Sequence, residues 1–391
     1  MRPRRRNARL ANRRSVRHQG LFRRRARRSS KLQRNRNKFP LSLRKLRAAS
    51  NSALANVAER STSTPTRRGD SRWLNRFIWF TAAATLFLIC SGGMVTSKNV
   101  GLAVPDWPTT FGYNMFLFPV SKWIGGVLFE HTHRLIASTV GFLTLILAAC
   151  LWRDEERSFV KILGLLAVVG VILQGILGGL RVTMLRDQIG ILHACLAQAF
   201  LALIVFIGIV RTNTWRNFAA TVDLTRFRPI KTIAIVTTIA IYAQLALGAT
   251  MRHQHKDLAI FDFPTANGQW IPDTSDAALA KINSWRDARA YSNVDAFQIW
   301  LQMIHRFVAG LIGLGVIWFA VRTSKAARDV LVLRRLSILW VGFFILQFGL
   351  GACTIWSNKA ADIATAHVAV GALMLCFGVS AWSFSSRVVS Q

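Results

Sequence analysis

Eight long apolar segments limit what this chain of 391 residues can fold into. Each segment is close to the length of about 20 residues that a helix needs to cross the hydrocarbon core of a bilayer. Backbone polar groups inside a bilayer must be satisfied within the segment, so such runs predict transmembrane helices. The segments are residues 77–96, 129–151, 160–180, 188–210, 230–250, 298–321, 332–356 and 363–384. The sequence therefore predicts an all-α membrane protein with eight transmembrane helices.

Positive charge is concentrated before the first apolar segment. Residues 1–72 hold 24 Lys and Arg residues against two acidic residues, in a chain whose net charge is +34. We interpret residues 1–72 as a disordered basic tail or a misassigned start, with an organellar transit peptide as the alternative. The tail is expected to be attracted to anionic membrane lipid. It lacks the aromatic interleaving of nucleic-acid-binding segments, so no specific nucleic-acid partner is expected.

The basic residues of the connections predict the orientation of the helices. Connections 152–161, 211–231 and 322–335 contain 3, 5 and 5 Lys or Arg residues and lie on the same side as the basic tail. By the positive-inside rule this side is the cytoplasm, so both termini are expected there. We favour a bacterial plasma membrane, and the mitochondrial inner membrane is the alternative.

Four histidines inside the apolar segments form two matched pairs, His133 with His193 and His305 with His367. An imidazole buried in a membrane bundle is costly and needs a partner, so a repeated set predicts ligands of an embedded metal centre. The sequence lacks zinc-type spacing, whereas a planar macrocycle takes two axial donors from facing helices. The pattern indicates heme iron, and hydrogen-bonded core histidines are the alternative.

Shared motifs indicate an internal duplication of the chain. The matching motifs are LAVPDWP at 102–108 with LAIFDFP at 258–264, and Glu130-x-x-His133-Arg134 with Gln302-x-x-His305-Arg306. We therefore expect two tandem, pseudo-symmetric four-helix bundles at residues 73–225 and 226–391, related by an axis along the membrane normal. Each bundle is expected to enclose one histidine pair.

The other three histidines after residue 72 are not expected to bind a metal. His131 stands two residues before His133, so it is expected on another face of the same helix. His253 and His255 follow the fifth apolar segment, and we interpret them as solvated residues of a polar outer loop.

The segment FEHTHR at 129–134, the Pro-Asp-Trp-Pro loop at 105–108, the four histidines and the duplicated eight-helix layout together resemble heme A synthase, the membrane enzyme of cytochrome oxidase assembly. The resemblance covers residues 77–384. It implies an oxidoreductase that oxidises the C8 methyl group of heme O to a formyl group, through hydroxylated intermediates, to give heme A.

The resemblance also implies where the two hemes bind. A heme b cofactor is expected at His305 and His367 in the C-terminal half, and the heme O substrate at His133 and His193 in the N-terminal half. Arginine suits charge-assisted pairing with carboxylates, so Arg134 and Arg306 are expected to neutralise heme propionates. Anchoring of the helix ends is the alternative for both arginines. The set of expected site residues is thus His133, His193, Arg134, His305, His367 and Arg306.

One position separates the chemistry of the two halves. Glu130 stands one helical turn before His133, where the other half has Gln302 before His305. A carboxylate near a heme can transfer protons or stabilise developing positive charge, and an amide can do neither. We predict that Glu130 is catalytic, with simple pairing to Arg134 as the alternative.

Partners follow from the same resemblance. Heme O synthase (protoheme farnesyltransferase) would pass its hydrophobic product within the membrane. Short cytoplasmic connections leave no room for a reductase domain, so an external electron donor, either a ferredoxin-like protein or a quinol, is expected. The oligomeric state is open, a homo-oligomer included. Two rival functions also stay open: a two-heme electron-transfer cytochrome b, and a heme carrier or transporter.

Overall fold

The computed structural model describes residues 71–218, 224–254 and 258–387, and the structural statements below concern these residues. The basic tail predicted at residues 1–72 lies almost entirely outside them, and so does His255. The described part is helical with irregular connections, and its strand-like pairing is limited to two isolated bridges in loops. Residues 68–391 form one compact unit.

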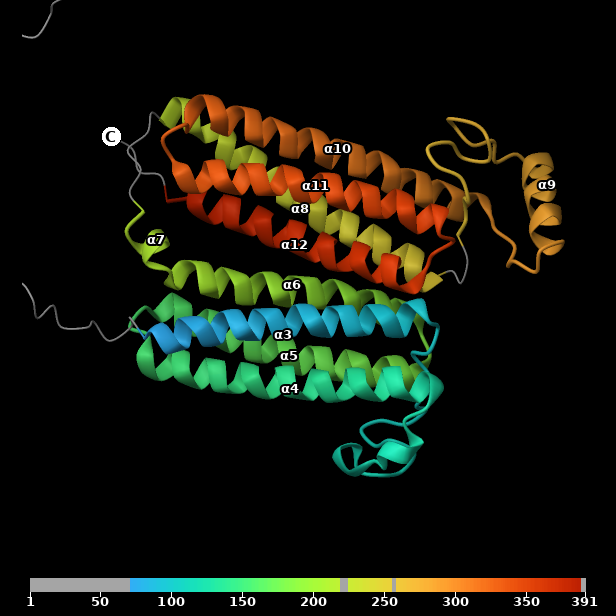
Figure 1. Ribbon diagram of the computed structural model, residues 1–391, viewed down its shortest axis with the longest axis horizontal. Helices are drawn as coiled ribbons and strands as arrows, with labels where there is room; N and C mark the ends of the chain where they lie inside the picture. Colours follow the sequence, from blue (N-terminus) through green and yellow to red (C-terminus); the bar gives the residue numbers. More distant parts are fainter. Residues whose placement is uncertain (1–70, 219–223, 255–257, 388–391) are drawn as a thin grey trace, which may run out of the picture. The chain divides into compact units, whose positions relative to one another are not determined.

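Within the described ranges, eight helices are long and apolar enough to cross a membrane (Figure 1). They are α3 (Arg72–Ser97), α4 (Gly125–Asp154), α5 (Ser158–Met184), α6 (Asp187–Arg211), α8 (Leu224–Gln254), α10 (Ala296–Ala326), α11 (Leu331–Trp356) and α12 (Ala361–Ser385). Each contains one of the predicted segments. The prediction of an all-α protein with eight spans is confirmed, and the chain is a multi-pass membrane protein.

Polar side-chain caps mark the N-terminal ends of α3 and α10, a few residues before the predicted segments. The Ser71 side chain accepts a hydrogen bond from the N–H of Leu74 at 3.3 Å, at the start of α3. Asp295 and Gln298 form a reciprocal capping box at the start of α10. Such caps satisfy the free N–H groups of the first turn and add nothing to the hydropathy signal.

Four short elements were not predicted. They are η2 (Met115–Leu117), η3 (Val120–Lys122), α7 (Asn213–Arg216) and α9 (Asp276–Asp287). The longest of them, α9, lies in the second long connection and begins at Ser275, whose side chain accepts the N–H of Ala278. Its mixed polar composition gives no apolar run, so hydropathy does not reveal it.

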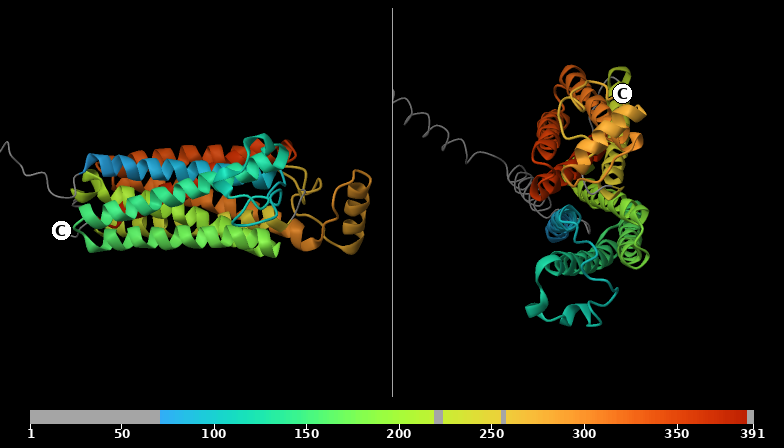
Figure 2. Two further views of the ribbon diagram at one scale, coloured as in Figure 1. Left: turned by 90° about the horizontal axis from the view of Figure 1, so that it is seen from below. Right: turned by 90° about the vertical axis from the view of Figure 1, so that its right-hand side faces the viewer.

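The spanning helices pack as two four-helix bundles. Helices α3, α4, α5 and α6 form one closed ring of contacts, and α8, α10, α11 and α12 form the other. The bundles share a wall, in which α12 contacts α3 and α6, and α6 contacts α8 (Figures 1 and 2). Half of the apolar window of α6 and 56% of that of α12 are buried, against 11% for α11, so these two helices are central. The pseudo-symmetry of the bundles stays a prediction, as do their boundaries at residues 225 and 226.

Both long connections leave the bundles at one end, which we call the loop end (Figure 1, right). Helices α4 and α10 begin there directly after the long connections, and α6 and α12 begin there after short turns. The side of the membrane that the loop end faces stays a prediction.

Large apolar side chains cover the outward faces of the bundles. Phe87, Phe142, Leu311 and Ile345 are each more than 60% exposed, on four different spanning helices. A surface so apolar is unfavourable in water and matches the hydrocarbon of a bilayer. The outward faces of the described helices are therefore suited to contact lipid.

Candidate functional site

All four paired histidines lie a short way inside the loop end. His133 is on α4, His193 on α6, His305 on α10 and His367 on α12, six to nine residues after each helix begins. At about 1.5 Å of rise per residue, the rings lie about 9 to 14 Å from the helix starts. Helices that begin at the same end thus bring the four rings to a similar depth.

The four rings line one cavity of about 990 Å³, whose walls come from both bundles. His133 and His193 are close enough to interact electrostatically, and so are His305 and His367. The volume lies at the upper end of the range for sites that enclose small molecules or cofactors. The structure therefore brings together the members of each predicted pair, in one shared space.

A glycine on a neighbouring helix faces each of the four imidazole rings. A Cβ atom added to the glycine would lie 2.9 to 3.5 Å from the Cε1 atom of the ring. The pairs are Gly92 with His133, Gly178 with His193, Gly248 with His305, and Gly351 with His367. A Cβ atom at Gly92 would force the ring of His133 to shift, and one at Gly351 or Gly248 would make a tight contact, whereas one at Gly178 would be in ordinary contact. The backbone of the facing helix thus limits where the rings of His133, His305 and His367 lie.

The donor set of the cavity fits a pair of planar, axially bound metal complexes. The Nδ1 atoms of all four rings are buried without a hydrogen-bond partner. The Nε2 atoms of His133, His193 and His305 make no hydrogen bond within the described part of the chain, which leaves them available as donors to a metal. No group of three or more His, Cys, Asp and Glu side chains suited to a metal ion occurs among the described residues. Two imidazoles per bundle match the two axial positions of a heme iron.

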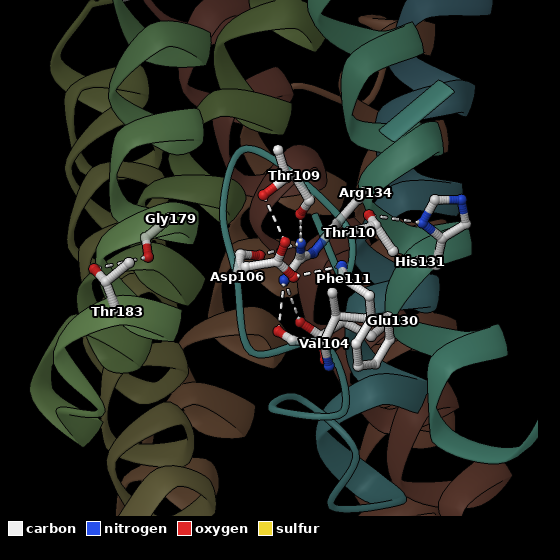
Figure 3. Close-up of polar contacts among 10 residues, drawn as sticks. All are labelled: Val104, Asp106, Thr109, Thr110, Phe111, Glu130, His131, Arg134, Gly179 and Thr183. Atoms are coloured by element: carbon white, nitrogen blue, oxygen red, sulfur yellow. Dashed lines mark hydrogen bonds and ion pairs between the residues drawn. The ribbon is translucent and has the colours of Figure 1, made fainter. Parts of the chain in front are cut away.

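Glu130 and Arg134 together hold the first long loop over the cavity (Figure 3). The Glu130 carboxylate accepts hydrogen bonds from the N–H of Val104 at 2.9 Å and from Arg134 at 2.8 Å. The Arg134 guanidinium also donates to the carbonyl groups of Val104, Asp106 and Thr109 at 2.7 to 3.0 Å. Both side chains are buried, and both line the cavity. The pairing of Glu130 with Arg134, which the sequence left as an alternative, is thus present.

Gln302 and Arg306 make the corresponding contacts with the second long loop. The Gln302 amide oxygen accepts the N–H of Ile260 at 3.0 Å. Arg306 donates to the carbonyl groups of Asp262 at 2.7 Å and Thr265 at 2.8 Å. Both Arg134 and Arg306 thus donate to loop carbonyls, while Nε of Arg306 is buried without a partner in the described part of the chain. The pairing of both arginines with heme propionates stays a prediction.

The first loop also packs against the third helix of its bundle. A Cβ atom added to Gly179 of α5 would lie 2.5 Å from the indole ring of Trp107, which lines the cavity. His131 is fully buried beneath the same loop, between Phe118 and Trp123, and is not among the residues that line the cavity. The expectation that His131 faces away from His133 fits this position.

The interpretation of His253 as a solvated loop residue is wrong. Helix α8 continues past the predicted end at residue 250, and it carries Arg252 and His253 into the wall of the cavity. Arg181 of α5 lines the cavity as well, and the sequence analysis missed both arginines. A signal was present, because Arg252 follows Gly248 by four residues and so lies on the helix face that meets His305.

The fold and the site define a class of protein: a membrane protein of eight spanning helices with two histidine pairs around a shared cavity. The sequence profile of the cytochrome oxidase assembly protein family, COX15-CtaA, matches residues 75–379, and the chain belongs to this family.

Several relatives in this family are named heme A synthase. The one from Shouchella clausii is 28% identical over 278 residues, which cover 68% of this chain and 83% of the relative. The one from Shewanella oneidensis is 25% identical, over 78% of this chain and 93% of the relative. The one from Alkalihalophilus pseudofirmus is 24% identical, over 80% and 95%. The similarity thus extends over most of each relative.

Proposed function

We propose that this protein is a heme A synthase, an oxidoreductase that converts the C8 methyl group of heme O into a formyl group through hydroxylated intermediates. The observation that carries the proposal is the cavity in which two pairs of imidazoles lie, each ring facing a glycine on a neighbouring helix. The names of the family relatives support the same reaction.

The two histidine pairs are assigned different hemes in this proposal. His305 and His367 hold a heme b cofactor, which supplies one-electron transfer when it is bound. His133 and His193 would hold the substrate heme O as ligands of its iron. The packed glycines keep the rings in place, and the loop with Trp107 restricts the entry of water from the loop end.

Glu130 is our candidate for a catalytic group in the N-terminal half. It lines the cavity one turn from His133, whereas the corresponding residue of the other half, Gln302, is neutral. A carboxylate near the substrate edge can accept a proton or stabilise positive charge that develops there. Its contacts with Val104 and Arg134 show that it also holds the loop, so a test must separate charge from loop packing.

The substitution Glu130→Gln provides that separation. Gln302 accepts the N–H of Ile260 as Glu130 accepts that of Val104, so a glutamine can keep this loop contact. We expect Glu130→Gln to retain both hemes and to lower formation of heme A by about 100-fold or more, the usual scale for loss of an acid or base group. Heme is extracted after coexpression with a heme O synthase and analysed for the formyl product. Glu156→Gln, at an exposed carboxylate of the opposite end, is the control.

The same experiment tests the proposed function as a whole. A formyl heme in the extract supports the synthase. Two permanently bound, unmodified hemes would show an electron-transfer cytochrome instead, and heme that is lost during purification would show a carrier. Full activity of Glu130→Gln would remove this side chain from the chemistry and leave the function standing.

The proposal extends to surroundings and partners. We propose a bacterial plasma membrane with both termini in the cytoplasm, because the basic connections share a side with the basic N-terminus. A heme O synthase would deliver the substrate within the membrane, and an external ferredoxin-like protein or quinol would supply electrons. A homo-oligomer is compatible with the exposed apolar helix faces.

A further inference from the structure

Two arginines in the cavity have no part in the function described so far. Arg181 is on α5 of the first bundle, and Arg252 is on α8 of the second. Both side chains line the cavity with the four histidines. Arg252 reaches across the wall between the bundles, where it donates to the carbonyl of Gly93 at 2.5 Å and to the hydroxyl of Ser97 on α3. The two guanidinium groups thus meet where the bundles adjoin.

Neither arginine of this pair makes a direct ion pair within the described part of the chain. Arg252 and Arg181 are close enough to repel each other. The contacts of Arg252 are with neutral oxygens, and Arg181 makes no hydrogen bond or ion pair to a described residue. Glu130 and Asp187 attract Arg181 without a direct contact, and the carboxylate of Glu130 is bonded to the loop and to Arg134. Two like charges away from bulk water are unfavourable without a counter-ion, so the pair is suited to bind an anion.

Two side chains of this region lie directly against glycine backbone. A Cβ atom added to Gly101 would lie 2.8 Å from Nη2 of Arg181, and one added to Gly190 would lie 2.7 Å from Nδ1 of His253. The glycines thus allow these side chains to lie close to the backbone.

Each arginine also lies within electrostatic range of a different pair, Arg181 of His193 and Arg252 of His367. His253 lies near both arginines and near His193. The three side chains therefore form one cluster within electrostatic range of both histidine pairs.

We propose that Arg181 and Arg252, with His253 beside them, form a carboxylate-binding site that takes a propionate group of a tetrapyrrole held by the histidine pairs. Guanidinium groups present paired N–H donors that match a carboxylate. The site rests on the proposed function, since it requires hemes at the histidines. It is distinct from Arg134 and Arg306, which donate to loop carbonyls through their Nη atoms.

The test compares two probes, heme b and its dimethyl ester, in which both propionates are neutral. Each is titrated into the full-length protein in detergent, and binding is followed by Soret absorption. We expect the protein to bind heme b roughly tenfold or more tightly than the ester, as for loss of a charged hydrogen bond. In the variant Arg181→Gln/Arg252→Gln the ratio of the affinity for heme b to the affinity for the ester should fall below about threefold. Arg186→Gln, at an exposed arginine of the adjacent turn, should keep the ratio of the unmodified protein.

Two further backgrounds identify which heme supplies the carboxylate. In His305→Ala only the first pair can bind, and in His133→Ala only the second pair can. A ratio that depends on the arginines in either background supports the site and assigns it to that half. The proposal is overturned if the arginine variant keeps the full ratio in both backgrounds, or if the unmodified protein binds both probes equally.

The proposed function has a separate criterion. Failure of the unmodified protein to develop a Soret band, or a band that survives alanine at all four histidines, would reject the heme assignment itself. Retained binding of the ester by the arginine variant shows that this variant is folded.

Discussion

At the scale of single residues, the site depends on positions that have no side chain. Each paired histidine meets a glycine on a neighbouring helix, and the same two residue types face each other four times. Interiors are packed densely enough that one added methyl group is felt by its neighbours. The glycines therefore help to determine where the imidazole rings lie.

The substitution Gly92→Ala tests this contribution. Its Cβ atom would lie 2.9 Å from Cε1 of His133, so the ring must rotate away from its position. A side chain moved off its rotamer costs about 0.5 to 1.5 kcal/mol, which corresponds to a roughly two- to tenfold weaker affinity for heme at the first pair. Soret titration in the His305→Ala background measures this affinity. Gly175→Ala of the same bundle, where the added atom meets nothing within 4 Å, is the matched control, and equal affinity in both variants would contradict the argument.

At the scale of elements, the long loops are organised by an aspartate in each. The Asp106 carboxylate accepts hydrogen bonds from the N–H groups of Phe111 and Gly112 and from the hydroxyl of Thr109. Asp262 makes the same three kinds of contact with Asn267, Gly268 and Thr265. Burial alone would raise the pKa of Asp106, but these hydrogen bonds outweigh it and lower the pKa below its usual value. The charged carboxylate is thus the form that holds the turn.

The first loop should therefore open in acid. A carboxylate with a lowered pKa in the folded state stabilises the loop above its unfolded pKa of about 3.9, and this contribution is lost as the pH falls through the folded value. We expect the amides of Phe111 and Gly112 to exchange hydrogen slowly near neutral pH and faster below about pH 4, after correction for intrinsic rates. Asp106→Asn should give fast exchange already at neutral pH. The turn at Asp262 is the internal control, and unchanged exchange at Phe111 in the variant would contradict this account.

A second element-scale feature lies at the end opposite the loops. Glu155, in the turn between α4 and α5, pairs with Arg157 at 2.9 Å and with the fully buried Arg211 of α6. Arg211 also donates to the Asn75 side chain of α3. Burial would raise the pKa of Glu155, but hydrogen bonds and charge from Arg157, with the charge of Arg211, lower it to about 2. The ion pair thus joins three helices of the first bundle and persists well below neutral pH.

Removal of the Glu155 charge should be costly. Glu155→Gln leaves Arg211 buried without its full counter-charge, and breaking a buried pair in this way costs about 3 kcal/mol or more. We expect a clear decrease in the thermal unfolding midpoint in detergent. Arg153→Gln, at an ion pair whose arginine is 80% exposed, should change the free energy of unfolding by less than about 1 kcal/mol. Equal losses of stability in the two variants would show that the buried ion pair stabilises the protein no more than the exposed one.

At the scale of the whole molecule, the sequence predicted the membrane-spanning helices but not the side-chain contacts between helices and loops. Apolar runs of membrane length identified all eight spanning helices, because the bilayer requires them. The repeated spacing of His133, His193, His305 and His367 likewise predicted residues that the fold brings together in pairs. Their role as ligands stays a prediction until heme binding is measured.

Other parts of the site depend on tertiary contacts that periodicity does not encode. Arg252 was missed, and His253 was misinterpreted as a loop residue, because the apolar signal ends at residue 250 although α8 continues. The contacts of Arg134 with loop carbonyls up to 30 residues away were not predicted, and its pairing with a propionate stays a prediction. The conformation of the loop determines which acceptors the guanidinium group contacts, and the Glu-x-x-His-Arg motif does not predict that conformation.

The shared wall also limits how this chain can be divided. Helices α6 and α12 each contact both bundles, so neither bundle has a complete surface of its own. A gene fragment that encodes one bundle would yield a protein whose most buried helix, α6 or α12, is exposed to lipid. Heritable changes in these two helices must satisfy both neighbours at once, and so they are expected to accumulate more slowly than changes in α11.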